Sequence, residues 1–395
     1  MKRLVTTICL FALVFAITNQ AGAIPAFARK YQLSCQTCHN PAPRLKPFGD
    51  EFAGNGFKML DQEAPRYFIP TGDPELNLLR DLPLAIRLEG FLSFKEQAEQ
   101  KFDFAAPYLV KIMSGGELTN SIAYYFYFYF DERGEVAGVE DAFIMFNDLL
   151  GLDLDMYVGQ FQVADPLFKG ELRLTLSDYE IYRLRPGLSR TNLAYDKGIM
   201  ATLGLETGTE IVVSVVNGNG LTRADRNRVF DYDKYKNFSG RISQDIGEKL
   251  RLGAFAYYGK EVPELFSGPV NNIFYFGPDM TLSFGEKLEF NLQYLFRSDS
   301  DLQISEETPT VQFTKTQGGF AEVIYMPKGI ESKWYFAGLL NYIESDLSEF
   351  DYRSATIHAG YLVKRNIRLA AEYTLLEKQS GSLKNQFSVG FSTAL

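Results

Sequence analysis

Residues 288–297 read Leu-Glu-Phe-Asn-Leu-Gln-Tyr-Leu-Phe-Arg, and their pattern decides the fold. Apolar side chains from Leu288 to Phe296 alternate with polar ones, which begin at Glu289 and end at Arg297. Side chains of a β-strand point alternately to opposite faces, so one face of this strand prefers hydrocarbon and the other prefers water. Such alternation over about ten residues is typical of the strands of outer-membrane β-barrels.

The same alternation recurs from Leu84 to the end of the chain. The segments that carry it begin near residues 84, 107, 119, 137, 152, 193, 209, 234, 249, 271, 287, 315, 332, 351, 366 and 384. Short turns are expected at 147–151, 206–208, 246–248, 285–286 and 365, and longer polar connections at 95–107, 163–191, 217–234, 259–271, 297–315 and 343–351. Short periplasmic turns that alternate with long outer loops are typical of bacterial barrels. We therefore predict a mainly β fold, an antiparallel transmembrane β-barrel of about 16 strands, with both of its ends on the periplasmic side.

The carboxyl-terminal segment supports the same architecture. Apolar residues occupy almost every second position from Phe387 to Leu395. This segment resembles the C-terminal strand that the outer-membrane assembly machinery recognises, although phenylalanine is commoner at the final position. A soluble β-sandwich is the alternative, but a sandwich does not need long and short connections in such regular alternation.

The N-terminal residues predict export and a chain of three parts. Residues 1–23 combine Lys2 and Arg3 with a short apolar run and an Ala-Gly-Ala ending, which is typical of a secretory signal peptide. Residues 24–81 are expected to form a small helical cap, and residues 84–395 to form the barrel. No later apolar segment approaches the length of about 20 residues that a spanning helix needs. The net charge of −9 argues against nucleic acid as a partner.

The cap contains the run Cys35-Gln36-Thr37-Cys38-His39, a C-x-x-C-H sequence typical of covalent c-type haem attachment. Two thiols at this spacing can bind the two vinyl groups of one porphyrin, and the adjacent imidazole can bind its iron. A disulfide, a redox dithiol and half of a zinc site are the alternatives. Zinc would need two further ligands, but the exported chain has no third cysteine and one other histidine, His358. Export also favours haem c, because bacteria attach it outside the inner membrane.

The rest of the cap predicts a short helix that depends on the barrel. Leu45, Phe48 and Phe52 recur at helical spacing and define one apolar face, and residues 54–56 then end the helix. A segment of about 60 residues rarely folds alone, and a barrel of about 16 strands leaves a lumen to fill. We therefore expect the cap to enter from the periplasmic side and plug the lumen. Inward charges could hold it by ion pairs or could only wet the wall, and they are Arg87, Glu89, Arg251, Glu289, Arg297, Arg368 and Glu372.

Two residues are candidates for the second axial ligand of the haem iron. Met59, in the cap, could supply a thioether, which would raise the potential. His358 is expected to face the lumen and could supply a second imidazole, or it could be only a polar residue of the wall. Lys58, water and an open position are the other possibilities.

Two features of the expected outer loops bear on access to the lumen. The long connection at 164–190 either folds inward as a constriction or stays exposed on the outside. Acidic residues of the outer loops could attract cations or could simply be solvated, and they are Asp299, Asp301, Glu306 and Glu307.

The chain resembles the fused cytochrome–porins of bacterial outer membranes, which are typified by iron-oxidising outer-membrane cytochromes. The resemblance is carried by the C-x-x-C-H run, by Pro-Arg-Leu-Lys-Pro-Phe-Gly (43–49), by Phe-Ala-Gly-Asn-Gly-Phe (52–57) and by the closing strand of the barrel. It implies one covalent haem c, with Cys35 and Cys38 in thioether bonds and His39 as the proximal iron ligand. It further implies transfer of single electrons between an extracellular redox couple and periplasmic carriers.

Three functions follow from these expectations. The first is an outer-membrane electron-transfer protein that links extracellular iron, or another couple, to a periplasmic cytochrome or other carrier, as an Fe(II) oxidase or a metal reductase. The second is a passive porin whose haem-bearing cap gates or stabilises the pore. The third is a haem-based sensor or a structural haem. In each case the barrel lies in outer-membrane lipid, with the haem segment in the periplasm or in the lumen.

Overall fold

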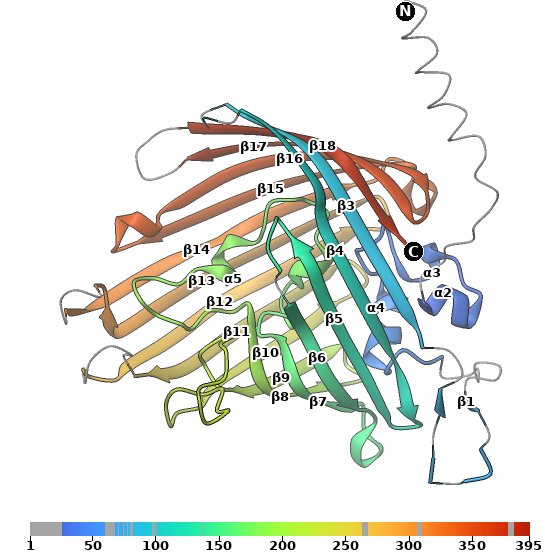
Figure 1. The fold of residues 1–395 in the computed structure, drawn as a ribbon, viewed down its shortest axis with the longest axis horizontal. Helices are drawn as coiled ribbons and strands as arrows, with labels where there is room; N and C mark the ends of the chain where they lie inside the picture. Colours follow the sequence, from blue (N-terminus) through green and yellow to red (C-terminus); the bar gives the residue numbers. More distant parts are fainter. Residues whose placement is uncertain are drawn as a thin grey trace, which may run out of the picture.

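The computed structural model describes residues 26–59, 68–69, 71–73, 75–76, 78–79, 82–96, 99, 101–136, 138–262, 268–305, 310–377 and 383–395. Within these ranges sixteen strands form one closed antiparallel barrel (Figure 1), which confirms the predicted fold class. The strands are β3 (Leu84–Lys95), β4 (Phe102–Thr119), β5 (Ile122–Glu132), β6 (Gly138–Phe146), β7 (Leu154–Gln162), β8 (Tyr195–Gly204), β9 (Thr209–Val216), β10 (Asn237–Ile246), β11 (Leu250–Glu261), β12 (Asn271–Phe284), β13 (Leu288–Gln303), β14 (Val311–Tyr325), β15 (Trp334–Ser345), β16 (Tyr352–Lys364), β17 (Ile367–Glu377) and β18 (Leu383–Ala394). Consecutive strands pair, and β18 closes the barrel on β3. The predicted signal peptide lies outside the described residues.

The two faces of the barrel differ as the alternation predicts. Along β16, Thr356 and His358 are buried in the interior, whereas Ile357 between them is 67 % exposed on the outer face. The same contrast recurs along the neighbouring strands, where large apolar side chains lie outside and polar ones inside. An apolar outer face around a closed sheet is the surface that a membrane-spanning barrel presents to lipid.

Two of the connections expected to be long are shorter than predicted, because the strands continue into them. β13 runs to Gln303 and β14 begins at Val311, so most of the expected loop at 297–315 is strand, and β11 and β12 likewise shorten the connection at 259–271. Asp299, expected in an exposed outer loop, is instead buried in β13 and forms an ion pair with Arg297 (2.7 Å). Asp301 also lies in β13, and Glu306 and Glu307 lie outside the described residues. Asp299 faces the lumen, so its polarity does not indicate a loop.

Three short helices form the cap, which we define as residues 26–59. They are α2 (Ala26–Tyr31), α3 (Cys35–Cys38) and α4 (Pro47–Gly54), and Figure 1 shows them at one end of the barrel, near the carboxyl end of β18. The predicted helical face is wrong at Leu45, because α4 begins at Pro47 and Leu45 instead pairs with His39 in an isolated β-bridge. The residue before a proline is pushed towards extended backbone, so the helix starts only at the proline.

Along the chain, a small two-stranded sheet of β1 (Phe68–Ile69) and β2 (Leu78–Leu79) follows the cap and precedes β3. Single 3₁₀ turns are η1 (Leu149–Gly151), η2 (Gly170–Leu172), η3 (Gly329–Glu331) and η4 (Ser348–Phe350). No helix of the described residues is both long and apolar enough to cross a membrane.

The connection between β7 and β8, residues 163–194, folds into the lumen, and we call it the β7–β8 loop. It contains η2 and the one-turn helix α5 (Glu180–Arg183), which Figure 1 shows inside the barrel. Tyr179 stacks on Phe320 of β14 with ring centroids 4.1 Å apart, and Phe168 meets the same ring edge-on. Of the two predicted alternatives for this connection, the inward one is confirmed.

The outer apolar face generates a test of the membrane-spanning assignment. Replacing Ile357 by Arg places a charge on the lipid-facing side near the middle of β16, and it should cost about 2–4 kcal/mol of folding free energy. Urea titrations of folding into phospholipid vesicles would measure the loss, with Ile357→Leu as the matched control. Equal midpoints for the two variants would contradict a lipid-facing position.

Candidate functional site

The C-x-x-C-H motif is held by two helices of the cap. Cys35 and Cys38 lie on the one-turn helix α3, and both are free, partly buried thiols. Ser34 caps α3, because its hydroxyl accepts a hydrogen bond from the backbone N–H of Gln36 (3.4 Å). α4 packs on α3 at Gly49, where any Cβ would overlap the carbonyl oxygen of Cys38. The missing side chain therefore allows the close contact that positions the motif.

The imidazole of His39 is oriented by the chain that follows it. Its Nδ1 lies 3.0 Å from the carbonyl oxygen of Pro43 and 3.3 Å from that of Arg44, so Nδ1 donates there and Nε2 is left for another partner. Burial lowers the pKa of His39, although the two carbonyl oxygens oppose the shift. A neutral imidazole whose second nitrogen is held by a backbone carbonyl is the arrangement typical of metal-binding histidines.

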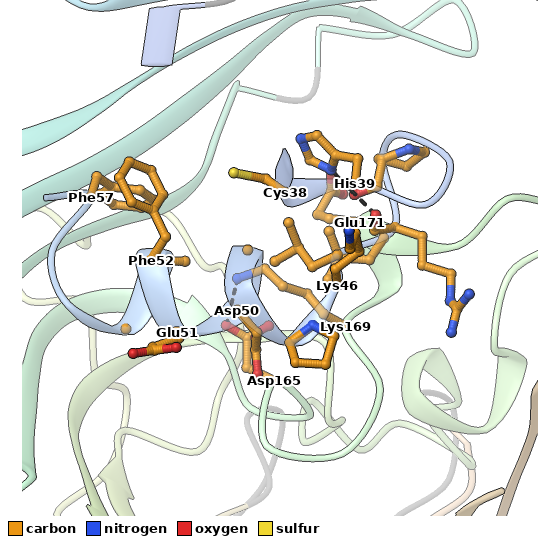
Figure 2. Close-up of a pocket in the computed structure, with 18 of the residues that line it drawn as sticks. Cys38, His39, Lys46, Asp50, Glu51, Phe52, Phe57, Asp165, Lys169 and Glu171 are labelled. Atoms are coloured by element: carbon orange, nitrogen blue, oxygen red, sulfur yellow. Dashed lines mark hydrogen bonds and ion pairs between the residues drawn. The ribbon is translucent and has the colours of Figure 1, made fainter. Parts of the chain in front are cut away.

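A cavity of about 1610 Å³ opens beside the motif and is lined by Cys35, Cys38 and His39. The inner wall of the barrel and the β7–β8 loop form its other sides. Figure 2 shows Cys38 and His39 on one side of α4, and Asp165 and Lys169 of the loop on the other. Ligand sites commonly hold about 300–1,000 Å³, so this cavity has room for a porphyrin.

An aromatic cluster docks the cap on the barrel beside the motif. The rings of Phe27 and Phe57 stack 4.8 Å apart, and Phe52 meets Phe27 edge-on at 5.5 Å. Phe57 also stacks on Tyr125 of β5 at 5.3 Å. The wall makes room for this ring at Gly115 of β4, where an added Cβ would lie 3.1 Å from it. The apolar side of the cap therefore rests on β4 and β5.

Polar contacts fasten the other parts of the cap to the barrel. Arg44 forms an ion pair with Glu289, and Arg368 donates to the carbonyl oxygen of Ala42 (2.9 Å). Of the inward charges predicted from the sequence, Glu289 and Arg368 thus hold the cap. Further contacts join the cap to β4 and to the short turns, from Lys30 to Glu117 (3.5 Å), Gln36 to Ile330 (2.5 Å), Lys58 to Asn120 (2.5 Å) and Asn147 to Gly54 (2.6 Å). These contacts place the cap at the short-turn end.

The donor atoms in the cap can be compared with the three alternatives to haem. Burial raises the pKa of the Cys35 and Cys38 thiols, whereas redox-active dithiols have thiols of lowered pKa. Zinc requires four ligands in a structural site, and the described ranges hold no group of three or more His, Cys, Asp or Glu residues arranged for a metal ion. Both thiols are free rather than joined in a disulfide. Two free thiols and an oriented imidazole beside a large cavity fit a covalent haem.

Neither of the two predicted distal ligands lines the cavity that His39 lines. Met59 packs against the aromatic side of the cap, and it is absent from the described residues that line the cavity. His358 faces the interior, as predicted, but it lines a second, smaller pocket, where its Nδ1 lies 2.9 Å from Oε2 of Glu372. Distal ligation by either residue stays a prediction.

A carboxylate with three arginine partners fixes the middle of the β7–β8 loop. Asp178 accepts from Arg133 at the end of β5 (2.9 Å), and from Arg173 (2.5 Å) and Arg183 (2.8 Å) of the loop itself. Burial alone would raise the pKa of Asp178, but the three guanidinium charges outweigh it and lower the pKa to about 2. The carboxylate is therefore charged at any physiological pH.

Other contacts fasten the loop to opposite walls of the lumen. On one wall, Glu171 pairs with Lys111 of β4, and Lys169 pairs with Asp141 of β6 (3.5 Å). On the other wall, the contacts are Leu176 N–H to Glu372 (2.7 Å), Tyr179 to Glu322 (3.0 Å), Tyr182 to Gln293 (3.2 Å) and Arg297 to the carbonyl oxygen of Thr191 (3.0 Å). The loop thus spans the lumen from wall to wall, between the cavity and the long-loop end.

Sequence reasoning missed the residues that bind this loop on the β4–β5 side. Lys111 lies at an inward position, with its Nζ 3.4 Å from the ring centre of Tyr127, and it pairs with Glu171. The sequence did contain a signal for this site. It was a lysine at an inward position of an apolar strand, next to a strand with tyrosines at every second position. The pairing itself required the path of the β7–β8 loop.

Comparison with known proteins shows the barrel fold. Solved structures similar to this chain include an anion-selective porin from Comamonas acidovorans (10 % identity, TM-score 0.57, covering 80 % of this chain and 99 % of the porin). OmpF of Salmonella typhi in complex with daunomycin (13 %, 0.58, 80 % and 97 %) and OmpT of Vibrio cholerae in its trimer form (11 %, 0.55, 80 % and 99 %) are similar to it as well. No protein-family model and no curated protein matches the chain. The chain is therefore a β-barrel with a porin-like fold.

The anchoring of the β7–β8 loop generates a prediction for ion flow. Removing the buried carboxylate by Asp178→Asn leaves the arginines without their shared partner, which typically costs about 3–5 kcal/mol. The loop should loosen, and single-channel conductance in planar bilayers should rise above that of the wild-type protein. Arg183→Gln, which removes the most exposed partner, is the matched control and should change conductance little.

The lowered pKa of Asp178 also predicts how the loop responds to acid. The stabilisation is fully present above the unfolded carboxylate pKa of about 3.9 and is lost as the pH falls through the folded value. Wild-type conductance should therefore stay low at pH 5 and rise only as the pH approaches 2. A rise already complete at pH 5 would contradict this role of Asp178.

Proposed function

We propose that this protein is a fused monohaem cytochrome c–porin of the bacterial outer membrane, which passes single electrons between an extracellular redox couple and periplasmic carriers. The observation that carries the proposal is the placement of Cys35, Cys38 and His39 together on the wall of a large cavity inside a barrel. The apolar outer face and the porin-like fold support a position in outer-membrane lipid.

The residues of the cap have distinct roles in this proposal. Cys35 and Cys38 would hold the porphyrin by two thioether bonds, and His39 Nε2 would bind its iron, because Nδ1 is already occupied by backbone carbonyl oxygens. The haem supplies a reversible one-electron couple. Phe52 and Phe57 exclude water from one side of the cavity, and an apolar surrounding of this kind is one means of tuning a haem potential.

The β7–β8 loop favours electron transfer over solute flow. Residues 165–169 of the loop line the cavity, and the loop is anchored on both walls of the lumen, at Lys111 and at Glu372 among other residues. The loop occupies part of the cross-section through which a solute would pass, whereas an electron needs no open passage. A passive porin with a haem-bearing cap is the second candidate, and the barrel fold is the observation that supports it.

The position of the cap indicates which side each partner approaches. The cap lies at the short-turn end, which is periplasmic in bacterial barrels, so a periplasmic cytochrome or other carrier would meet the cap. Extracellular iron or another couple would reach the opposite side of the β7–β8 loop. The potentials of these partners would decide whether the protein works as an Fe(II) oxidase or as a metal reductase.

Haem attachment is testable on the full-length chain produced in cells that mature c-type cytochromes. The wild-type protein should keep one haem through denaturing electrophoresis, detected by haem staining and by intact mass. Replacing both Cys35 and Cys38 by Ala should abolish the covalent haem while the barrel still shows heat-modifiable migration. Ser34→Ala is the control, because it changes only the helix cap and should retain haem. A wild-type chain without covalent haem would overturn the proposal.

Electron transfer and solute flow can be separated on the haem-loaded protein. Mixing the ferric protein with ferrous iron in a stopped-flow spectrometer, at several pH values, should reduce the haem, and liposomes that contain the protein should admit sugars slowly. A haem that no soluble extracellular couple oxidises or reduces, together with rapid sugar entry, would favour the passive porin instead.

A further inference from the structure

Three methionines of the barrel wall line the cavity beside the C-x-x-C-H motif. They are Met113 of β4, Met145 of β6 and Met200 of β8. Met145 and Met200 are buried, with 1 % and 5 % of their surface exposed, so their side chains are covered by neighbours. Met113 is only partly buried and therefore presents surface to the cavity. Of the described methionines that line the cavity, Met113 is the most accessible to a group bound there.

Met113 lies next to the place where the cap docks. It shares the inner face of β4 with Gly115, on which Phe57 of the cap packs, and residues two apart on a strand are separated by about 6.6 Å. Its register partner across the β3–β4 pair is Ala85, a small residue that also lines the cavity. The barrel wall next to Met113 therefore carries small side chains on the side where the cap docks.

The polar groups around Met113 already have partners within the protein, so none of those named here competes with its sulfur for a bound metal ion. Lys111, the next inward residue along β4, is held by Glu171 and lies over Tyr127. Tyr127 is the register partner of Met113 on β5, and Tyr125, two residues before it, stacks on Phe57 of the cap. A thioether carries no proton and needs none removed to bind iron, so it can act as a ligand without a nearby base.

We propose that Met113 supplies the thioether that binds the haem iron on the face opposite His39. This inference rests on the proposed haem function and adds to it, because it takes the second axial ligand from the barrel wall instead of the cap. Coordination by Met113 would join cap and barrel through the iron itself. Histidine–methionine ligation raises the potential of a haem, which suits a weakly reducing donor such as ferrous iron.

The experiment compares absorption spectra and midpoint potentials of the full-length, haem-loaded protein in detergent. Ferric wild-type protein should show the near-infrared charge-transfer band of thioether-ligated haem. Met113→Leu should lose this band and lower the midpoint potential while keeping the covalent haem. Met113→His should give a low-spin spectrum with two imidazole ligands, provided that residue 113 reaches the iron. This second variant keeps the test decisive if the leucine variant folds poorly.

Matched controls are Met145→Leu, a second methionine of the cavity wall, and Met59→Leu in the cap. Both should keep the band and the potential of the wild-type protein. A band that survives in Met113→Leu, or one that is lost in Met59→Leu alone, would overturn the inference and leave the haem function intact. A wild-type protein that carries haem but lacks the band would also overturn it. A wild-type protein without haem would instead overturn the proposed function.

Discussion

The constraint on which this structure depends is the absence of water in the hydrocarbon core of a membrane. Backbone N–H and C=O groups must then be satisfied within the protein, and a sheet can do this only by closing on itself. Pairing of β18 with β3 completes the closure. A barrel of this size encloses a lumen too wide for side chains of the strands alone to fill. Among the described residues, the cap and the β7–β8 loop contribute side chains to this interior.

Charges in the lumen serve a purpose that differs from their usual role on a surface. An exposed ion pair contributes little, but a buried carboxylate left without its partner is strongly destabilising. Glu289 binds the cap, Glu372 binds the β7–β8 loop, and Asp178 binds three arginines. The contacts of Glu289 and Glu372, and that of Asp178 with Arg133, join these segments to the barrel, while Arg173 and Arg183 pair with Asp178 within the loop. The same barrel that must present apolar residues to lipid uses its other face to position the segments beside the C-x-x-C-H motif.

The strands were predictable from the sequence because lipid and lumen impose a period of two on every one of them, as residues 288–297 show. The grouping of Cys35, Cys38 and His39 was predictable because these residues are close together in the sequence. The anchors of the β7–β8 loop were not, since Asp178 and Arg133 meet only after the loop has folded inward. Strand ends were also misjudged near Asp299, because a polar residue facing the lumen and one in a loop have the same composition.

The distal ligand illustrates how far local reasoning extends. A sequence search favours a methionine close to the motif along the chain, and Met59 satisfies that condition. The cavity, however, is formed by segments far apart in the sequence, and the wall that completes it includes Met113. A cap too small to fold alone must bury its apolar surface against the barrel. If the barrel also supplies the second iron ligand, an undocked cap would lack that ligand and would have a different haem potential. The redox activity of the haem would then depend on completed assembly of the barrel.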